Sequence, residues 1–250
     1  MKYAIITGAS RGLGAAAAQQ MLEKDIHVVS VSRNESSLLK QAAEHAGGSY
    51  SHFSCDLAAA DQVQSVFSKI AEFVFKDAEI VYVINNAGVI EPIEVGGELD
   101  PSLVQTNVHV NLTAPILISN LFLQKAKDTG CKVVIANVTS GAAERPIHGW
   151  SIYCSTKAAV NMFTMTAGLE LEQNGSPSRV IAFSPGIMDT DMQSTIRSSN
   201  EEAFADLETF RKYKESGSLR SPDVVAGALV KLILADSLEN GMIYRVNDLL

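Results

Sequence analysis

The chain has 250 residues, of which 46% are hydrophobic and 19% charged, and its formal net charge at pH 7 is −8. This length and apolar content predict one domain, 1–250, with a large buried core. The acidic balance and the scattered basic residues argue against a nucleic-acid partner. The apolar start at 1–7 is too short for a signal peptide and no segment reaches the roughly 20 apolar residues of a membrane span, so we expect a cytoplasmic protein without a membrane partner. Three cysteines without a CxxC pair and five histidines without ligand spacing predict reduced thiols and no metal site.

Short β-branched runs alternate with segments of helical spacing along the chain. We expect strands at 3–7, 26–31, 49–55, 80–84, 132–138, 180–183 and 242–246, and helices at 14–24, 36–46, 61–75, 101–127, 151–173 and 222–235. The runs 81–84 and 133–136 are apolar without alternation, which is typical of parallel strands covered on both faces by helices. The pattern predicts a single-domain α/β fold of the Rossmann type, with a doubly wound, mostly parallel seven-stranded sheet. The polar segment 188–221 interrupts this pattern, and we expect a substrate lid there.

A glycine-rich turn follows the first expected strand, in the sequence Thr7-Gly8-Ala9-Ser10-Arg11-Gly12-Leu13-Gly14. Glycine permits the tight turn from strand to helix and lets the backbone approach a phosphate at a helix N-terminus. The spacing is G-x-x-x-G-x-G rather than G-x-G-x-x-G, so its position after the first strand is what favours a cofactor site. The candidate cofactor-binding residues in this turn are Gly8, Ser10, Arg11, Gly12, Leu13 and Gly14.

The second expected strand ends in Val31-Ser32-Arg33-Asn34, without the acidic residue that binds the 2′-hydroxyl of NAD. Arg33, with help from Arg11, can instead pair with the 2′-phosphate of NADP(H), although both can also be solvated surface arginines. NADP(H) is therefore the expected cofactor. Other residues that follow strands lie at the edge where open α/β sheets bind ligands, but they also suit turns. These further candidates for cofactor binding are Asp56, Leu57, Asn86, Ala87 and Gly88.

Tyr153 and Lys157 lie four residues apart at the start of an expected helix, so both side chains project from one face. A phenol has an ordinary pKa of about 10, and a neighbouring ammonium with a cationic nicotinamide would stabilise its ionised form. Ser140 lies thirteen residues before Tyr153, where its hydroxyl can face the same carbonyl oxygen. Asn111 falls inside the long fourth helix; an asparagine there is often only solvated, but it can also bind a water that connects Lys157 to solvent.

These motifs, together with Asn-Asn-Ala-Gly at 85–88 and Ser-Pro-Gly at 184–186, occur in an order and spacing that resembles the short-chain dehydrogenase/reductase family over essentially the whole chain. The resemblance implies a catalytic tetrad of Asn111, Ser140, Tyr153 and Lys157. It implies nicotinamide contacts from Pro185, Gly186, Ile187 and Thr190, and cofactor contacts from Tyr153 and Lys157. In the implied reaction a hydride passes to a carbonyl carbon while Tyr153 protonates the oxygen.

The family resemblance also implies a homodimer, formed by the helices expected at 101–127 and 151–173. The C-terminal segment 241–250 departs from the family's usual Asp-Gly-Gly ending, which puts tetramer formation in doubt. A catalytically idle NADP-binding or sensing protein would share the same fold. The intact tetrad speaks against that alternative.

Two subgroups of the family are similar to this chain around the expected substrate site. The segment 184–193 resembles sepiapterin reductases, and its continuation through 199, with 149–150, 161–164 and 214–222, resembles bacterial benzil reductases, which form (S)-benzoin from a diaryl 1,2-diketone with NADPH. We therefore expect a small-molecule carbonyl substrate, an aromatic 1,2-diketone such as benzil, in an apolar pocket. Candidate substrate contacts are Ile147, Trp150, Met188, Asp191 and Met192.

Some of these substrate contacts have an alternative. Met188 and Met192 can equally be packing residues of the core or the lid. In a pterin reductase, Asp189 or Asp191 would anchor a guanidinium-like group of the substrate. Both aspartates can also simply cap the helix that follows them.

Overall fold

The structure is a computed structural model that describes residues 1–47 and 49–250. Seven parallel strands form one sheet, in the order β3-β2-β1-β4-β5-β6-β7. The strands are β1 (Lys2–Thr7), β2 (His27–Ser32), β3 (Tyr50–Ser54), β4 (Ile80–Asn85), β5 (Lys132–Val138), β6 (Arg179–Ser184) and β7 (Ile243–Arg245). The prediction of a doubly wound α/β sheet is confirmed, and each expected strand is found at its place in the chain.

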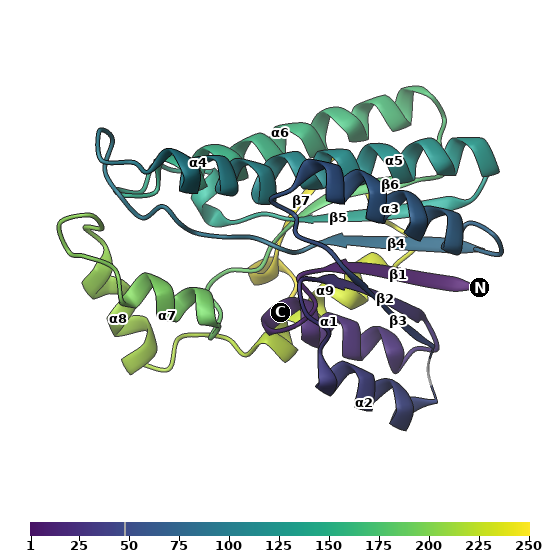
Figure 1. The fold of residues 1–250 in the computed structure, drawn as a ribbon, viewed down its shortest axis with the longest axis horizontal. Coiled ribbons are helices and arrows are strands. Elements are labelled where there is room, and N and C mark those ends of the chain that lie inside the picture. The colour runs from purple at the N-terminus through teal and green to yellow at the C-terminus, as the bar shows by residue number, and fades with distance from the viewer. Residues whose placement is uncertain (48) are drawn as a thin grey trace.

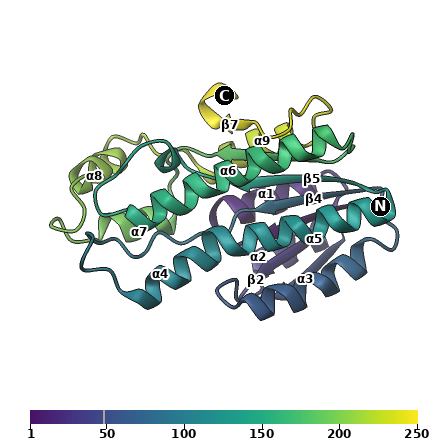
Figure 2. The same cartoon turned by 90° about the horizontal axis from the view of Figure 1, so that it is seen from above.

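Helices cover both faces of this sheet (Figure 1). On one face lie α1 (Gly12–Leu22), α2 (Ser37–Ala46) and α9 (Pro222–Ile233), and on the other lie α3 (Ala60–Val74), α5 (Ala114–Thr129) and α6 (Ser151–Gln173). Figure 2 shows α5 and α6 side by side over the sheet. Among the described residues, no helix combines the length and the apolar character that crossing a membrane requires.

The strands are apolar on both sides because each side has its own core. Successive side chains of a strand point to opposite faces of the sheet. Ile6 and Val28 therefore pack against α1, α2 and α9, whereas Ile5 and Val29 pack against α3 and α5. All four side chains are fully buried, which explains the runs without polar alternation.

The single helix expected at 101–127 is interrupted, so that prediction was wrong. α4 (Pro101–Val108) passes into a π-helical turn at His109–Thr113 before α5 begins. Pro115 explains the interruption, because a proline has no N–H for the carbonyl four residues earlier and its ring clashes with that carbonyl. The residue four positions before Pro115 is Asn111, which therefore lies in the π-helical turn. Such turns occur frequently at functional sites.

The segment 188–221 contains two helices, α7 (Asp191–Arg197) and α8 (Leu207–Glu215). They lie beyond the carboxyl ends of the strands, apart from the helices that cover the sheet (Figure 1). Four buried apolar side chains of the segment pack against Trp150 and Tyr153 at the start of α6; these are Ile196, Phe204, Leu207 and Phe210. The segment is thus a small helical unit placed over one end of the sheet.

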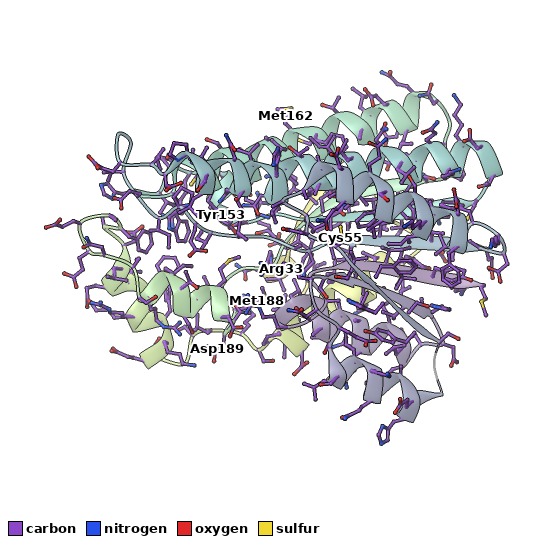
Figure 3. The ribbon with its side chains drawn as sticks, viewed as in Figure 1. Arg33, Cys55, Tyr153, Met162, Met188 and Asp189 are labelled. Atoms are coloured by element: carbon purple, nitrogen blue, oxygen red, sulfur yellow. The ribbon has the colours of Figure 1, made fainter. Side chains whose placement is uncertain are left out.

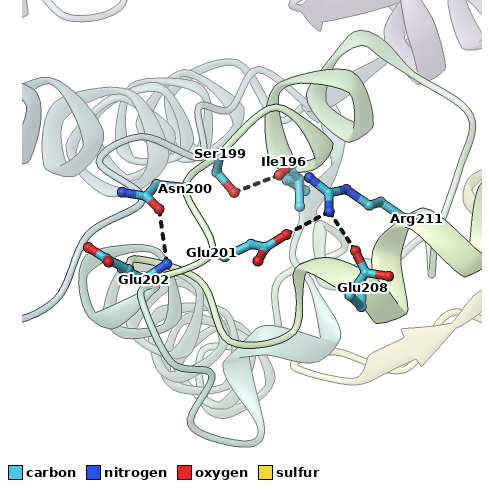
Figure 4. A network of polar contacts seen from close by, with 7 residues as sticks. All are labelled: Ile196, Ser199, Asn200, Glu201, Glu202, Glu208 and Arg211. Carbon is cyan, nitrogen blue, oxygen red and sulfur yellow. Dashed lines mark hydrogen bonds and ion pairs between the residues drawn. The ribbon is translucent and has the colours of Figure 1, made fainter.

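Polar contacts hold the connection between α7 and α8 (Figure 4). The Arg211 guanidinium pairs with Glu201 at 2.9 Å and with Glu208 at 2.5 Å. Two local hydrogen bonds add to this network: Ser199 Oγ donates to Ile196 O at 2.7 Å, and Glu202 N donates to Asn200 Oδ1 at 3.0 Å. The side chains of the Arg211 ion pairs are largely exposed, so we attribute the position of the segment mainly to its buried apolar side chains.

Candidate active site

The glycine turn lies at the carboxyl end of β1, where the strand order reverses between β1 and β4. Gly8 and Gly12 adopt φ angles of +66° and +56°. A Cβ atom at Gly14 would lie 2.4 Å from the carbonyl oxygen of Gly8, so no side chain fits there. Arg11, the N-cap of α1, makes no side-chain capping bond, and the first turn of α1 has no acidic residue. The N–H groups of this turn therefore suit an anionic group such as the diphosphate of a dinucleotide.

Hydrogen bonds fasten the glycine turn to the end of β4. Asn86 Nδ2 donates to the carbonyl oxygens of Thr7 at 2.9 Å and Gly8 at 3.3 Å. Thr7 Oγ1 in turn accepts from the backbone N–H groups of Asn86 and Ala87, both at 3.0 Å. The side chain of Asn86 thus shapes the turn, and any cofactor contact from it remains a prediction. No role was predicted for the Thr7 side chain, although its place at the end of the first strand was visible in the sequence.

The remaining predicted residues of the glycine turn differ in how far their side chains are exposed to solvent. Ser10 and Arg11 are exposed, whereas the side chain of Leu13 is buried in the core beneath α1. Any contact of Leu13 with a cofactor therefore comes from its backbone. Arg11 Nη1 forms an ion pair with Asp191 of α7 at 2.8 Å. The turn and the 188–221 segment are thus linked through two exposed side chains.

Arg33 lies exposed at the end of β2 and has no acidic partner within ion-pair distance among residues 1–47 and 49–250. Figure 3 shows it at the same end of the sheet as Tyr153. Asp56 Oδ1 accepts a hydrogen bond from Ala58 N at 3.0 Å, so this carboxylate is used in a local turn. Leu57 is buried against the core of α3 and α5. Arg33 is therefore the predicted adenosine-side residue whose charge is available to a ligand.

Tyr153 and Lys157 are both buried on one face of α6, as the spacing predicted. Lys157 Nζ lies 5.7 Å from the centre of the Tyr153 ring and donates to Val138 O at 2.9 Å. Burial lowers the pKa of Lys157 to about 8. Burial raises the pKa of Tyr153 to about 12, and a hydrogen bond with the side chain of Ser140 opposes this rise. Within the protein chain Tyr153 therefore keeps its proton at neutral pH, which is the state that a proton donor needs.

Asn111 is held by three hydrogen bonds and is not solvated, since only 1% of it is exposed. Its Oδ1 accepts from Val89 N at 2.9 Å, and its Nδ2 donates to Val89 O and to Asn107 Oδ1, both at 2.8 Å. Asn107 Oδ1 also accepts from Thr156 Oγ1 at 3.2 Å. The alternative of a merely solvated Asn111 is therefore wrong. Asn107 was missed as its support, although the spacing of four between the two asparagines was a visible signal.

The four predicted tetrad residues meet near the end of β4. A Cβ atom at Gly88 would lie 3.3 Å from Asn111 Oδ1 and 3.6 Å from Lys157 Nζ, so both side chains border this glycine. Ser140 follows β5 and is the N-cap of a 3-10 turn, Gly141–Ala143, whose Ala142 N–H donates to Ser140 Oγ at 3.1 Å. The structure thus brings residues from the loop after β5, from α6 and from the π-helical turn to one place.

After β6 the chain passes along the glycine turn. Pro185 is buried, Gly186 is exposed with φ of +69°, and Ile187 is half-buried. Thr190 lies across from Gly12, because a Cβ atom at Gly12 would lie 3.4 Å from Thr190 Cγ2. The segment 185–190 therefore borders the same space as the turn, as predicted for residues that line a nicotinamide.

Neither predicted aspartate serves as the N-cap of α7, which is Thr190. Asp189 forms an ion pair with Lys214 at 2.6 Å, and Asp191 forms the ion pair with Arg11. Met188 packs against the core of α1 and α9 rather than against the residues around Trp150. For Met188 the structure therefore favours the packing alternative over a substrate contact.

An aromatic cluster adjoins Tyr153 beneath the 188–221 segment. The Trp150 ring stacks on Phe204 with centroids 4.9 Å apart and an interplanar angle of 6°. Trp150 meets the rings of Tyr153 and Phe210 edge to face at 5.6 and 5.4 Å. Ile147 and Met192 pack at the border of this cluster. Phe204 and Phe210 were not predicted as part of the site, and their only signal in the sequence was their apolar character within a polar segment.

The family model for short chain dehydrogenases matches residues 2–201. The chain belongs to this family. It is 42% identical over 252 residues to a benzil reductase ((S)-benzoin forming) of Bacillus subtilis (strain 168), with all of both chains covered. It is 30% identical to the sepiapterin reductase of Mus musculus, covering 95% of this chain and 93% of the relative. The crystal structure of the KRED1-Pglu enzyme matches with a TM-score of 0.82 at 30% identity, covering 98% of this chain and all of the other.

These matches confirm the predicted family and its fold. They also confirm the resemblance to benzil and sepiapterin reductases. The chain is therefore an oxidoreductase of a family that uses a nicotinamide dinucleotide. The glycine turn and the buried Tyr153–Lys157 pair fit such a cofactor, because the first offers backbone N–H groups to a diphosphate and the second places a cation and a proton donor together.

Proposed function

We propose that the chain is an NADPH-dependent carbonyl reductase whose substrate is an aromatic 1,2-diketone such as benzil, reduced to (S)-benzoin. The observation that carries the proposal is the buried Tyr153 beside an aromatic cluster. The first feature supplies a proton to a carbonyl oxygen, and the second suits planar aryl groups. The full-length identity to a benzil reductase supports the same substrate class.

The four tetrad residues have distinct roles in this proposal. Bound NADPH supplies the hydride. Tyr153 gives its proton to the substrate oxygen while Ser140 hydrogen-bonds that oxygen and stabilises its developing charge. Lys157 binds the ribose hydroxyls of the cofactor. Asn111, fixed in the π-helical turn, holds a water through which the proton of Tyr153 is replaced.

Arg33 supports the choice of NADPH over NADH. Its exposed guanidinium is charged in both cofactor complexes, but only NADPH carries a 2′-phosphate with which it can pair. Arg11 is engaged with Asp191, so we assign it the second place in this site. The ion pair between Arg11 and Asp191 would also hold the 188–221 segment, the proposed lid, against the glycine turn.

The remaining cofactor contacts follow the arrangement around the glycine turn. The backbone of Gly8, Gly12, Leu13 and Gly14, with Ser10, would surround the phosphates, and Asp56 and Leu57 would border the adenine. Ala87 and Gly88 would lie along the ribose, and Pro185, Gly186, Ile187 and Thr190 along the nicotinamide. The support for this assignment is that all these segments end at the same edge of the sheet.

We further propose a cytoplasmic homodimer. The three cysteines are unpaired, as is usual in a reducing compartment. Met162, Met165 and Leu169 share one face of α6, and their exposed fractions are 59%, 39% and 54%. Leu117 of the neighbouring α5 is also 39% exposed. Such an apolar surface suits pairing with a second copy of the chain.

A pterin carbonyl reductase is the second candidate, favoured by the similarity to sepiapterin reductase. Its guanidinium-like substrate needs a free carboxylate. Asp189 and Asp191 each already pair with a cationic side chain, which argues against this use. An idle NADP-binding protein is a third candidate, and the assembled tetrad argues against it.

The test compares four carbonyl compounds: benzil, isatin, sepiapterin and a simple aldehyde. NADPH oxidation is followed by the absorbance of the reduced nicotinamide, and the benzoin formed is analysed on a chiral column. We expect benzil to give the highest kcat/KM, with (S)-benzoin as product. Preference for sepiapterin would replace the proposal with a pterin reductase, and no turnover of any compound would favour the idle binding protein.

A further inference from the structure

Trp150 carries a buried hydrogen-bond donor that has no acceptor. Its Nε1 has no hydrogen-bond partner among the described residues, and only 4% of the residue is exposed. Buried side-chain donors are nearly always paired, so each exception calls for a reason. Trp150 directly precedes α6 and lies three residues before Tyr153. An unpaired donor beside the proposed proton donor points to a ligand that brings its own acceptor.

The surroundings of the indole explain why the protein itself offers no acceptor. One face of the ring is covered by Phe204, and the rings of Tyr153 and Phe210 meet it edge to face. The other buried members of this cluster are apolar: Ile90, Ala142, Ile196 and Leu207. None of these apolar side chains offers an acceptor to the N–H, which a bound molecule can supply.

We propose that the Trp150 N–H donates a hydrogen bond to the second carbonyl oxygen of a 1,2-dicarbonyl substrate, while Tyr153 and Ser140 hold the oxygen that is reduced. This inference rests on the proposed function and names a residue that selects within it. The two oxygens of a 1,2-diketone lie on adjacent carbon atoms, and Trp150 and Tyr153 lie side by side with ring centroids 5.6 Å apart. One substrate can meet both donors once it displaces the side chains that cover the N–H in this structure.

The same hydrogen bond would make the site specific for substrates with a second carbonyl oxygen. A site that is built to pair a substrate oxygen discriminates against an analogue without that oxygen, because its own buried donor then stays unpaired. A monoketone of the same shape leaves the Trp150 N–H in its unpaired state. Trp150 is thus a specificity residue of the reductase, whereas Phe204 contributes only an apolar wall.

The variant Trp150→Phe tests this role, because phenylalanine keeps an aromatic ring against Phe204 but lacks the N–H. The substrates are benzil and deoxybenzoin, which has the same two phenyl groups and one carbonyl. We expect kcat/KM for benzil to fall about 10- to 100-fold more than kcat/KM for deoxybenzoin, which loses only part of its aromatic contact. The control Phe204→Leu disturbs the stacked wall and keeps the N–H, so both substrates should lose equally. NADPH fluorescence titration verifies that each variant binds the cofactor.

A second measurement uses the wild-type chain, so it does not depend on how a variant folds. Trp150 is the only tryptophan in the sequence, so its indole gives a single ¹⁵N–¹H signal. With NADP⁺, which carries no hydride to transfer, benzil should move this signal downfield and deoxybenzoin should not. An equal shift with both compounds, or an equal loss of both activities in Trp150→Phe, would overturn the inference. Wild-type turnover of benzil in that case would leave the proposed function intact.

Discussion

The buried ammonium of Lys157 should destabilise the folded chain at neutral pH. Its pKa is about 8, compared with the ordinary 10.5. This difference corresponds to a cost of about 3 kcal/mol for holding the charge in the fold. Lys157→Met removes the charge at similar side-chain volume, but it leaves the carbonyl of Val138 without its 2.9 Å hydrogen bond, at a cost of about 1 kcal/mol. The variant should therefore be more stable than the wild type by about 2 kcal/mol at neutral pH.

The stability difference between the wild type and Lys157→Met should change with pH in one direction. Between the folded pKa of about 8 and the ordinary value of 10.5, the unfolded chain binds more protons at this site than the folded chain. The wild type therefore gains stability relative to Lys157→Met as the pH rises through this range. The stability difference in favour of Lys157→Met should therefore shrink as the pH rises. Above the ordinary pKa the wild type should be the more stable protein, because the variant then differs only by its lost hydrogen bond to Val138.

Urea unfolding followed by circular dichroism measures this difference, at one protein concentration and across the pH range. The exposed Lys40 of α2 provides a matched control, since Lys40→Met removes a charge that is in contact with water. We expect no pH-dependent difference between that variant and the wild type. Parallel stability curves for the wild type and Lys157→Met would refute the reasoning, because they would mean that burial has no effect on the Lys157 ammonium.

Three further predictions concern the cofactor and the assembly. Arg33→Ala should weaken NADPH binding about 10- to 100-fold in fluorescence titrations and leave NADH unchanged, because a charge-assisted bond to the 2′-phosphate is lost; equal losses for both would move the selectivity elsewhere. Gly14→Ala places a methyl group 2.4 Å from the carbonyl oxygen of Gly8, so the thermal midpoint and the cofactor affinity should both fall, and an unchanged midpoint would contradict the geometry. Met162→Glu puts a charge on the exposed face of α6, where Figure 3 labels Met162. Analytical sedimentation of this variant should then show monomers. A dimer that persists in the variant would place the interface on another surface.

The sheet was predictable because its signals are local. The apolar runs of strands such as β4 and β5 follow from burial on both faces of the sheet. Each run can be recognised from a short stretch of sequence. The helix expected at 101–127 failed for an equally local reason. Pro115 is visible in the sequence, but the helical spacing on both sides of it conceals the interruption that its missing N–H causes. The interruption matters because it contains Asn111.

Those parts of the proposed site that depend on short-range sequence patterns could be predicted. The glycine turn and the spacing of Tyr153 and Lys157 are short-range patterns, and the structure places each where the pattern implied. The ion pair between Arg11 and Asp191 joins residues 180 positions apart, and no periodicity reports such a contact. The stacking of Phe204 on Trp150 likewise depends on how the 188–221 segment folds back over α6. Long-range pairs of this kind require the tertiary structure.

The pKa of the Tyr153 hydroxyl shows how local chemistry and burial can oppose each other. The sequence predicted that Lys157 lowers this pKa. Within the protein chain, burial outweighs any such effect and raises it to about 12. The lowering by Lys157 together with a cationic nicotinamide stays a prediction for the cofactor complex. Burial alone thus keeps the proton on Tyr153, and the neighbouring cations would make that proton easier to give up.

The proposed reduction depends most directly on the proton that Tyr153 gives to the substrate oxygen. The decisive measurement is NADPH oxidation with benzil by the wild type and by Tyr153→Phe, with NADPH affinity determined in parallel by fluorescence. We expect turnover to fall by about 10²- to 10⁴-fold or more in the variant while the affinity for NADPH stays nearly unchanged. Turnover by Tyr153→Phe at the wild-type rate would contradict the account.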